Sequence, residues 1–511
     1  MTTTARIDLD GLTLDAIGQG ALRGRPVTVL GLARSGIALT RFLADAGALV
    51  TVYDSRPADD LGEAIARLEG RAITLALGPA VDPAGTWADA ALVATSPSIS
   101  PDFPTTEPRL RAALRDLVAA AARGDSPGPA LVSEADLFLR LCPAPTIGVT
   151  GTKGKTTTSS LIAALLAVDR GHPVVLGGNI GSPLIDRLPE LTTAHRVVDE
   201  LSELQLPTLS RGTTVAVYTN VTSDHLDRHG TLDAYRSVKR RLADLVDPAG
   251  VLVLNDDDPV VAAYGNDAAT RVIRYRRDRP PAGGLGVIDG WLVADGVARL
   301  SLAGGGLAPI DPDGRVMPVV ELAIPGAHNV SNAMAAIAVA LSFGIDPAAI
   351  RRAAASFSGV EHRLETVAIV DGVRFVNDSQ GTQPDAVIAA LRAFDPPIVL
   401  IAGGRDKAID LSLLAPEVAG RAVAAVLIGE SGPALEASFR TAGLARTERA
   451  DDLATAVVRA DSIAREFEGA TVLLSPAAAS FDMFVDYAAR GRAFRAAVAA
   501  LDTARQEGTR R

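Results

Sequence analysis

The most chemically informative run of the sequence is TGTKGKTTT at residues 150–158, which joins a predicted strand to a run of helical period. Glycines in such a loop let backbone N–H groups face a phosphate, and the following helix N-terminus adds a positive dipole. Lys155 can reach the β- and γ-phosphates, and Thr156 can bind Mg²⁺, although Val149 departs from the common GxxxxGK[ST] spacing. The sequence therefore predicts a nucleoside-triphosphate site that comprises Gly151, Thr152, Lys153, Gly154, Lys155, Thr156 and Thr157.

Two later strand ends carry groups that could bind a metal ion. Glu200 ends the predicted strand at residues 196–200, where a carboxylate can hold Mg²⁺ but can also merely cap a helix. His225 follows the next predicted strand and is the best placed of the six histidines. A lone histidine more often satisfies a local hydrogen bond. Spacing alone leaves both roles open for each residue.

A glycine turn at residues 31–36 predicts a second ligand site near the start of the chain. It lies between two predicted strands, the second of which ends at Asp54, and this arrangement is half of a Rossmann unit. The turn and the Ser35 hydroxyl can receive a diphosphate, with Asp54 or Arg56 beside the nucleoside. Ala33 replaces the second glycine of the GxGxxG pattern, which weakens but leaves open a nicotinamide dinucleotide as the ligand.

Strand-like runs alternate with longer helical runs along the chain, which predicts an α/β fold with parallel sheets. A length of 511 residues suggests about three domains at roughly 150 residues each. A Gly-, Ser- and Pro-rich stretch at residues 124–129 reads as a linker, and a third block opens near His362. We expect a Rossmann-like domain at 1–127, a P-loop domain at 128–360 and a Rossmann-like domain at 361–511.

Composition excludes several classes of protein. Lys and Arg number 50 against 60 Asp and Glu, and the net charge of −10 disfavours nucleic acid and anionic membranes as partners. Cys142 is the only cysteine, so no internal disulfide can form, which suits a reducing compartment. No apolar run is long enough to cross a bilayer. We expect a soluble, cytoplasmic protein.

Several further motifs follow the phosphate loop along the chain. The run at 150–158 is followed by GGNIGSP (177–183), ELSELQL (200–206), NVTSDHLDRH (220–229), YRSVKRR (235–241), GAHNVSNAMAA (326–336), HRLE (362–365), VNDS (376–379), GGRDK (403–407) and LSPAAASFDMF (474–484). In order and spacing this set resembles the Mur ligase superfamily, over nearly the whole chain.

The resemblance implies a three-domain, ATP-dependent ligase of cytoplasmic peptidoglycan synthesis. ATP would phosphorylate the carboxylate of UDP-N-acetylmuramoyl-L-alanine, and the amine of D-glutamate would attack the acyl phosphate. Mg²⁺ would occupy two sites, and the enzyme would be a monomer. Nucleic acid and membrane insertion would play no part.

The resemblance also implies roles for individual residues. Lys155, Glu200, His225 and Lys239 would be catalytic; Thr156 and Glu200 would hold one Mg²⁺, with His225 and a carbamylated Lys239 at the second. Besides the phosphate loop, ATP would contact Asn329, Asn332, Arg363 and Asp378. The UDP substrate would contact Arg34, Ser35, Gly36, Asp54, Ser55, Arg56, Ser96, Asn179 and His225. Glutamate would contact Thr382, Lys407, Ser475 and Phe484.

Some positions keep alternatives open. By itself, Lys239 within YRSVKRR reads as part of a solvated basic helix face. Gln380 stands where the family usually has lysine, and Glu203 and Ala478 also depart from its pattern. Ligation of L-glutamate to the same nucleotide and folylpolyglutamate-like ligation are therefore the alternative activities. A catalytically inactive scaffold would be expected to lose the four catalytic residues, and all four are present.

Overall fold

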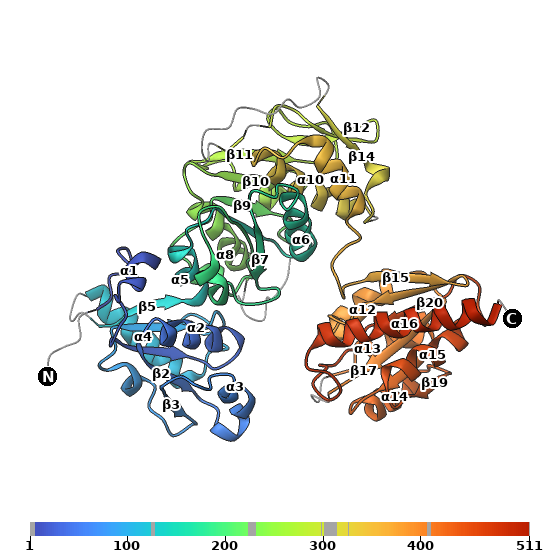
Figure 1. Cartoon of the computed structure of the whole chain (residues 1–511), viewed down its shortest axis with the longest axis horizontal. Helices are drawn as coiled ribbons and strands as arrows, with labels where there is room; N and C mark the ends of the chain where they lie inside the picture. The colour runs from blue at the N-terminus through green and yellow to red at the C-terminus, as the bar shows by residue number, and fades with distance from the viewer. Residues whose placement is uncertain are drawn as a thin grey trace. The chain divides into compact units, whose positions relative to one another are not determined.

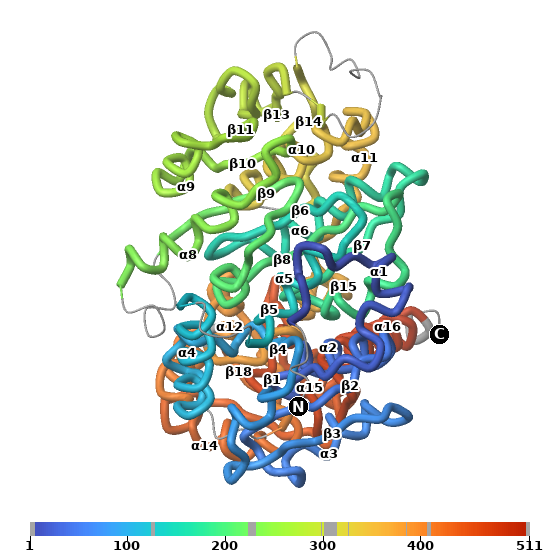
Figure 2. The backbone as a smooth tube through the Cα atoms, turned by 90° about the vertical axis from the view of Figure 1, so that its left-hand side faces the viewer, coloured from blue at the N-terminus to red at the C-terminus, as the bar shows by residue number. Residues whose placement is uncertain are grey.

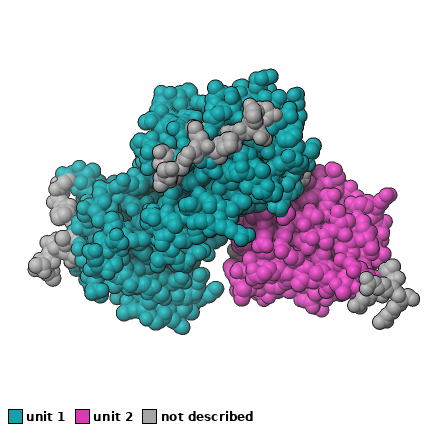
Figure 3. Space-filling view, turned by 45° about the horizontal axis from the view of Figure 1, so that its top comes forward, with its two compact units in different colours: residues 1–357 teal, residues 358–511 magenta. Residues whose placement is uncertain are grey.

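The structure is a computed structural model that describes residues 6–123, 128–222, 231–297, 299–300, 314–324, 326–405 and 410–509. The described chain forms three β-sheets (Figure 1). It divides into two compact units, residues 1–357 and residues 358–511 (Figure 3). The predicted α/β class is confirmed, whereas the expected domain boundaries stay a prediction.

The first sheet of unit 1 is parallel throughout, in the order β3-β2-β1-β4-β5. The strands run outward in one direction from β1 to β3 and in the other from β4 to β5, so the order reverses between β1 and β4. Ligands of open α/β sheets bind at such a switch point. The helix α2 ends at Asp45, and residues 46–48 separate it from β2, which begins at Leu49. The elements are α1 (Leu14–Gly18), β1 (Pro26–Leu30), α2 (Arg34–Asp45), β2 (Leu49–Asp54), α3 (Gly62–Ala66), β3 (Ile73–Leu77), β4 (Leu92–Thr95), α4 (Pro108–Arg123), β5 (Ala130–Ser133) and α5 (Glu134–Leu141).

The second sheet has the order β14-β13-β12-β11-β10-β9-β6-β8-β7. It is parallel from β7 to β12, and β12, β13 and β14 extend it in antiparallel fashion. Its elements are β6 (Thr146–Thr150), α6 (Lys155–Leu166), β7 (Val174–Gly178), β8 (Arg196–Glu200), β9 (Val215–Tyr218), α8 (Leu232–Leu245), β10 (Val251–Asn255), α9 (Pro259–Ala263), β11 (Arg271–Tyr275), β12 (Leu285–Ile288), β13 (Trp291–Ala294), β14 (Arg315–Pro318), α10 (Ala327–Ser342) and α11 (Pro347–Ser356).

The described residues of unit 1 form three hydrophobic cores, of which the smallest packs α4 against the first sheet. The apolar helix α10 packs against α6 over one face of the second sheet, as the Ala- and Val-rich sequence of α10 requires. The third core is shared by both sheets, since strands of each contribute to it together with α5 and the 3₁₀ segment η3 (Leu184–Glu190). Figure 2 lets the reader follow the chain from the first sheet into the second. The shared core holds the two sheets of unit 1 in place against each other.

Unit 2 is a six-stranded sheet in the order β15-β16-β20-β17-β18-β19, parallel except for the β15–β16 hairpin. One core lies on each of its faces. Because the parallel strands share one direction, β16, β17 and β20 end at the same edge. The elements are β15 (Glu365–Val370), β16 (Val373–Asn377), α12 (Pro384–Arg392), β17 (Ile398–Gly403), α13 (Leu414–Arg421), β18 (Ala422–Ile428), α14 (Gly432–Thr441), β19 (Thr447–Arg449), α15 (Leu453–Ala464), β20 (Thr471–Leu474) and α16 (Tyr487–Thr509).

Among the described helices, none combines the length and the apolar composition that crossing a membrane requires. Residues 124–127 of the expected linker lie outside the described residues.

Candidate functional site

The loop between β6 and α6 has the backbone that a phosphate cradle needs. Gly151 has φ +150° and Gly154 has φ +85°, in the region that favours glycine. A Cβ at Gly151 would lie 2.0 Å from Thr219 Oγ1, and one at Gly154 would lie 2.6 Å from Asn332 Oδ1. Both glycines are thus required by close packing as well as by backbone conformation.

Residues just after β9 hold this loop. Thr152 N donates to Asn220 O at 2.7 Å, and Lys153 N donates to Asn220 Oδ1 at 2.9 Å. Thr219 Oγ1 and Asn220 Nδ2 both donate to the carbonyl of Lys153, at 2.6 Å and 2.9 Å. These bonds join the ends of the parallel strands β6 and β9. The Thr219–Lys153 bond spans 66 residues, so the shape of the loop depends on a segment that is distant in sequence. The loop is therefore preorganised by tertiary contacts that its own motif does not reveal.

Lys155, the first residue of α6, lies over the loop. Its Nζ donates to the carbonyls of Gly151 and Thr152, both at 3.0 Å. On the same helix Thr156 is buried and Thr157 half-buried. From α10, Asn332 is buried against the loop and donates to Asn329 Oδ1 at 3.1 Å. The structure thus brings the expected ATP residues of unit 1 together around one loop.

Lys239 lies beneath the same loop and not on a solvated face. Its side chain is fully buried, and Nζ donates to Gly151 O at 3.1 Å and to Thr150 Oγ1 at 3.3 Å. The ring of Tyr235, one turn earlier on α8, lies 5.6 Å from Nζ. The interpretation of Lys239 as part of an exposed basic face is therefore wrong. The face of α8 that packs inward carries Tyr235, Lys239, Leu242 and Ala243, so the orientation of the helix, and not the basic run itself, buries Lys239.

Glu200, at the end of β8, has the features of a metal ligand. It is 1% exposed, and its Oε1 accepts a hydrogen bond of 2.9 Å from Asn179 Nδ2. The other oxygen, Oε2, is buried and has no hydrogen-bond partner in the part of the chain that the structure describes. A buried carboxylate oxygen without a partner is costly unless a cation or water satisfies it. The residue therefore fits Mg²⁺, and Thr156 comes from α6, which packs on β8.

The glycine turn after β1 carries the expected UDP residues. Leu32 N donates to Asp54 Oδ2 at 2.9 Å, and Arg56 donates from Nε to Oδ1 and from Nη2 to Oδ2 at 3.1 Å and 2.9 Å. Burial by itself would raise the pKa of Asp54, but the hydrogen bonds from Arg56 and from the backbone outweigh it and hold that pKa below its ordinary value. Asp54 is therefore an anion that orients Arg56.

A pocket of about 480 Å³ opens beside this ion pair. Of the expected residues, Asp54, Ser55 and Arg56 line it, while Ser96 is buried next to the turn and its Oγ has no hydrogen-bond partner among the residues that the structure describes. Ser35 is half-buried in the first turn of α2. Residues 105–107 and Leu204 also line the pocket. Sequence reasoning missed residues 105–107 because no recognised motif contains them, and it missed Leu204 because the motif ELSELQL does not indicate contact with this pocket.

A series of hydrogen bonds in unit 1 connects Arg34 to Asn179 and Asn179 to Glu200. Arg34 Nη1 donates to Gly181 O at 2.9 Å and Nη2 to Asn179 O at 3.3 Å. Asn179 in turn bonds to Glu200. The expected UDP residues and the expected metal ligand are therefore adjacent.

Gly36 offers a direct test of the turn. A Cβ on Gly36 would lie 1.8 Å from Gly31 O and 3.2 Å from Ser96 Oγ. We expect Gly36→Ala to lower the free energy of unfolding by about 1–3 kcal/mol and to weaken binding of a UDP nucleotide, since the turn must move. Thermal unfolding and nucleotide titration measure both effects. Gly18→Ala, where nothing lies within 4 Å of the added methyl, is the matched control; equal behaviour of the two variants would contradict this account.

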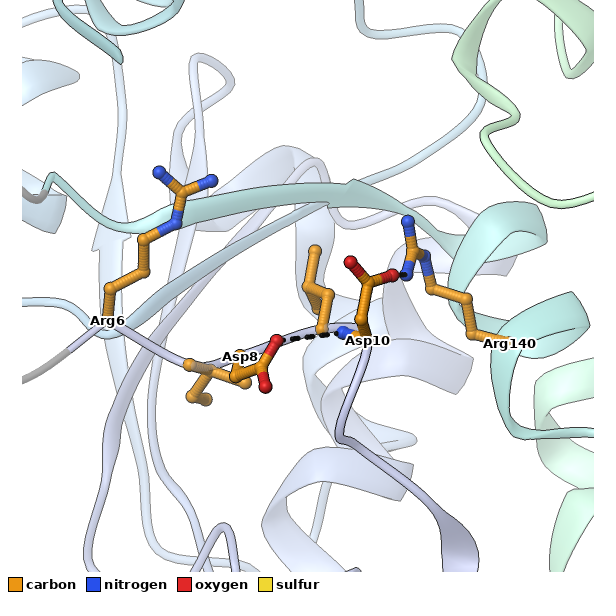
Figure 4. A pocket seen from close by; sticks show the side chains of 6 residues that line it. Arg6, Asp8, Asp10 and Arg140 are labelled. Atoms are coloured by element: carbon orange, nitrogen blue, oxygen red, sulfur yellow. Dashed lines mark hydrogen bonds and ion pairs between the residues drawn. The ribbon is translucent and has the colours of Figure 1, made fainter. Parts of the chain in front are cut away.

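Another pocket, of about 450 Å³, lies at the N-terminal segment (Figure 4). Two of its charged residues pair with each other, because Arg140 contacts Asp10 at 2.9 Å, and Arg140 also contacts Asp136 on its own helix at 2.9 Å. None of the expected site residues lines it. We assign it to packing of the segment against α5.

In unit 2, residues expected to contact ATP and residues expected to contact the glutamate substrate lie together at one edge of the sheet. Ser475, directly after β20, donates from Oγ to Asp378 Oδ2 at 2.7 Å, and Leu364 N donates to Asp378 Oδ1 at 3.2 Å. Burial raises the pKa of Asp378 to about 6, against the opposing effects of these hydrogen bonds and of the Arg363 charge. A carboxylate in this position is already oriented by its neighbours.

The other described residues that are expected to contact the glutamate substrate lie on loops at the same edge. Thr382 follows Gly381, whose Cβ would lie 2.5 Å from Ser475 Oγ. Phe484 is half-buried, and its backbone N–H donates to Ser480 O at 2.8 Å. His225 and Lys407, two further expected site residues, lie outside the described residues.

Arg490 is a residue of this edge that sequence reasoning missed. It is 1% exposed and donates to Ser379 Oγ and Ser379 O at 3.0 Å each, and to Ala478 O at 3.1 Å. Burial lowers its pKa to about 10, so the guanidinium remains charged at neutral pH. One buried cation thus joins the loop after β16 to the loop after β20. Its position in a long Arg- and Ala-rich helix offers no sequence signal.

Comparison with known proteins agrees with this geometry. Residues 149–340 match the Mur ligase middle domain, and residues 362–478 match the Mur ligase, glutamate ligase domain. The UDP-N-acetylmuramoylalanine–D-glutamate ligase of Symbiobacterium thermophilum is 38% identical over 478 residues, which are 93% of this chain and 97% of that protein. The chain belongs to the Mur ligase family.

Other Mur ligases also match nearly the whole chain. The enzyme of the same name from Pelotomaculum thermopropionicum is 38% identical over 93% of this chain and 98% of its own length. A solved UDP-N-acetylmuramate–alanine ligase from Thermotoga maritima is 20% identical, covers 92% of this chain and 98% of its own, and has a TM-score of 0.49. The matches to the Mur ligase domains and the relatives at 38% identity confirm the resemblance found from the motifs.

Proposed function

We propose that this Mur ligase joins D-glutamate to UDP-N-acetylmuramoyl-L-alanine at the expense of ATP, in cytoplasmic peptidoglycan precursor synthesis. The observation that carries the proposal is the 38% identity to D-glutamate ligases along 93% of the chain. The geometry of unit 1 supports it, because two lysines bond to the phosphate loop after β6, and the neighbouring strand β8 ends at the buried carboxylate of Glu200.

The reaction has two steps. A carboxylate oxygen of the L-alanyl group attacks the γ-phosphorus of ATP, the bond to the β-phosphate oxygen breaks, and ADP leaves. The glutamate amine then attacks the acyl carbon of the acyl phosphate, phosphate leaves, and the amine loses a proton as the amide forms. In the first step Lys155 and the loop N–H groups offset the negative charge on the transferring phosphoryl group.

The chain also supplies ligands for divalent cations. Thr156 and Glu200 would hold one Mg²⁺, and a carbamylated Lys239 with His225 would hold a second. When bound, Mg²⁺ neutralises charge on the phosphoryl oxygens and so favours attack by a carboxylate. A carbamate would convert the buried Lys239 from a cation into an anionic oxygen ligand, which a cation can accept as a neighbour.

The UDP group and the glutamate acceptor would bind at strand ends of two different sheets. The UDP group would bind at the glycine turn and in the pocket lined by Asp54 and Arg56. Glutamate would bind in unit 2 beside Thr382, Ser475, Phe484 and Lys407, with Arg363 and Asp378 contacting the nucleotide. We also propose that the enzyme works as a monomer in the cytoplasm.

The stereochemistry of the acceptor is the sharpest test of the proposal. Two carboxylates held at separate points leave the amine one productive direction, and a misplacement of about 1 Å can cost roughly 100-fold in rate. We therefore expect kcat/KM for D-glutamate to exceed that for L-glutamate by about 100-fold or more. Phosphate release with UDP-N-acetylmuramoyl-L-alanine and each enantiomer measures it.

The alternatives predict different results in the same assay. Preference for L-glutamate, which the missing cation at Gln380 keeps open, would overturn the acceptor and leave the ligase chemistry intact. Turnover with a pteroate and L-glutamate, without any UDP nucleotide, would instead identify a folylpolyglutamate-like ligase. Absence of phosphate release with every acceptor would indicate a scaffold.

A further inference from the structure

We infer that Asn179 is a positioning residue for Glu200: its carboxamide fixes one carboxylate oxygen and thereby leaves the other for a divalent cation. The inference rests on the proposed function, since it concerns the cation that a Mur ligase uses with ATP. It differs from the expectation that Asn179 contacts the UDP substrate, because it assigns the side chain to the metal carboxylate.

The local chain geometry brings Asn179 to Glu200. Gly178 ends β7 with φ +94°, and a Cβ there would lie 2.1 Å from Asp199 Oδ1 and 2.7 Å from Glu200 O. Only glycine permits this turn, which places Asn179 beside the end of β8. Asn179 N then donates to Glu200 O at 2.8 Å.

The side-chain bond is separate from this backbone bond. Asn179 Nδ2 donates to Glu200 Oε1 at 2.9 Å, and the backbone pairing would close the turn without it. Arg34 holds the same peptide from the other side, through Asn179 O and Gly181 O. The carboxamide is thus aimed at the carboxylate by contacts on both sides of its residue.

The chemistry of the donor matters. A carboxamide is neutral, so it orients Glu200 without cancelling the negative charge, whereas an arginine or lysine in its place would do so. With Oε1 occupied, Oε2 is buried and has no partner among the described residues. A fixed and charged carboxylate with one unsatisfied oxygen is suited to hold a cation, and partners that orient ligands in this way typically change metal affinity 10- to 100-fold when removed.

The test measures cation binding directly. Mn²⁺ affinity is determined by electron paramagnetic resonance of the unbound ion, with the full chain and a non-hydrolysable ATP analogue and without UDP substrate. We expect Asn179→Ala to weaken Mn²⁺ binding about 10-fold or more, with Asn179→Gln recovering part of the loss because it keeps the donor. Asn266→Ala, at an exposed asparagine, should leave the affinity unchanged.

A double-mutant cycle separates positioning from a general structural role. If Asn179 acts through Glu200, Asn179→Ala should weaken Mn²⁺ binding little further in a Glu200→Gln background. Additive losses in the two backgrounds, or a wild-type Mn²⁺ affinity in Asn179→Ala together with a raised KM for the UDP substrate, would overturn the inference. The binding assay needs no turnover, so failure of the proposed ligase activity would show separately, in phosphate release.

Discussion

Lys155→Ala should abolish turnover while the protein stays folded. The ammonium of Lys155 lies over the loop, bonded to the carbonyls of Gly151 and Thr152, and the side chain is only half-buried. Its loss removes a positive charge from the transferring phosphoryl group without leaving a cavity in the core. Removal of a single electrostatic contact of this kind costs about 100- to 1000-fold in kcat, and we expect at least a 100-fold loss.

Phosphate release measures the loss, and thermal unfolding shows that the fold persists. Arg170→Ala is a suitable control, because it removes an exposed positive charge just beyond the other end of α6. A well-folded Lys155→Ala protein with nearly normal kcat would refute the assignment of the loop to phosphoryl transfer.

Lys239→Ala should be equally damaging, and its activity should return in part with small carboxylic acids. Of the 50 Lys and Arg residues in the chain, four are lysines, at positions 153, 155, 239 and 407. All four lie in the motifs of the expected site. Arginine serves as the cation elsewhere, and a guanidinium does not form the carbamate that we propose for Lys239. We expect an activity loss of about 100-fold, on the scale of a lost charge contact, for both Lys239→Ala and Lys239→Arg.

Rescue discriminates the carbamate from a structural role. Acetate or formate can supply the missing anion in Lys239→Ala, where truncation leaves room, but not in Lys239→Arg. In solutions of ¹³C-bicarbonate, a carbamate resonance should be present in the wild type and absent from both variants. Arg240→Ala, which removes a half-buried side chain paired with Asp244 at 3.0 Å, should have a small effect. Full activity of Lys239→Ala would leave burial as the only role of this residue.

Local motifs predicted a glycine loop between a strand and a helix, and the structure has this loop between β6 and α6, because its backbone depends on residues adjacent in sequence. Glycines with positive φ, a lysine at the start of a helix and a threonine after it can be recognised without knowing what packs around them. The α/β class followed similarly from the alternation of strand-like and helical runs. The order of the motifs was sufficient to predict family membership.

Tertiary structure alone decided which of these residues meet. The burial of Lys239 depends on how α8 is oriented against β6, and the YRSVKRR run suggested the opposite face. The bonds from Asn179 to Glu200 and from Ser475 to Asp378 span 21 and 97 residues, and Arg490 reaches Ser379 across 111. Such pairings are set by strand order and by the packing of helices on the sheets, which place distant strand ends at one edge. Residue types and local spacing determine what each side chain can do, whereas the fold determines the partner with which it does it.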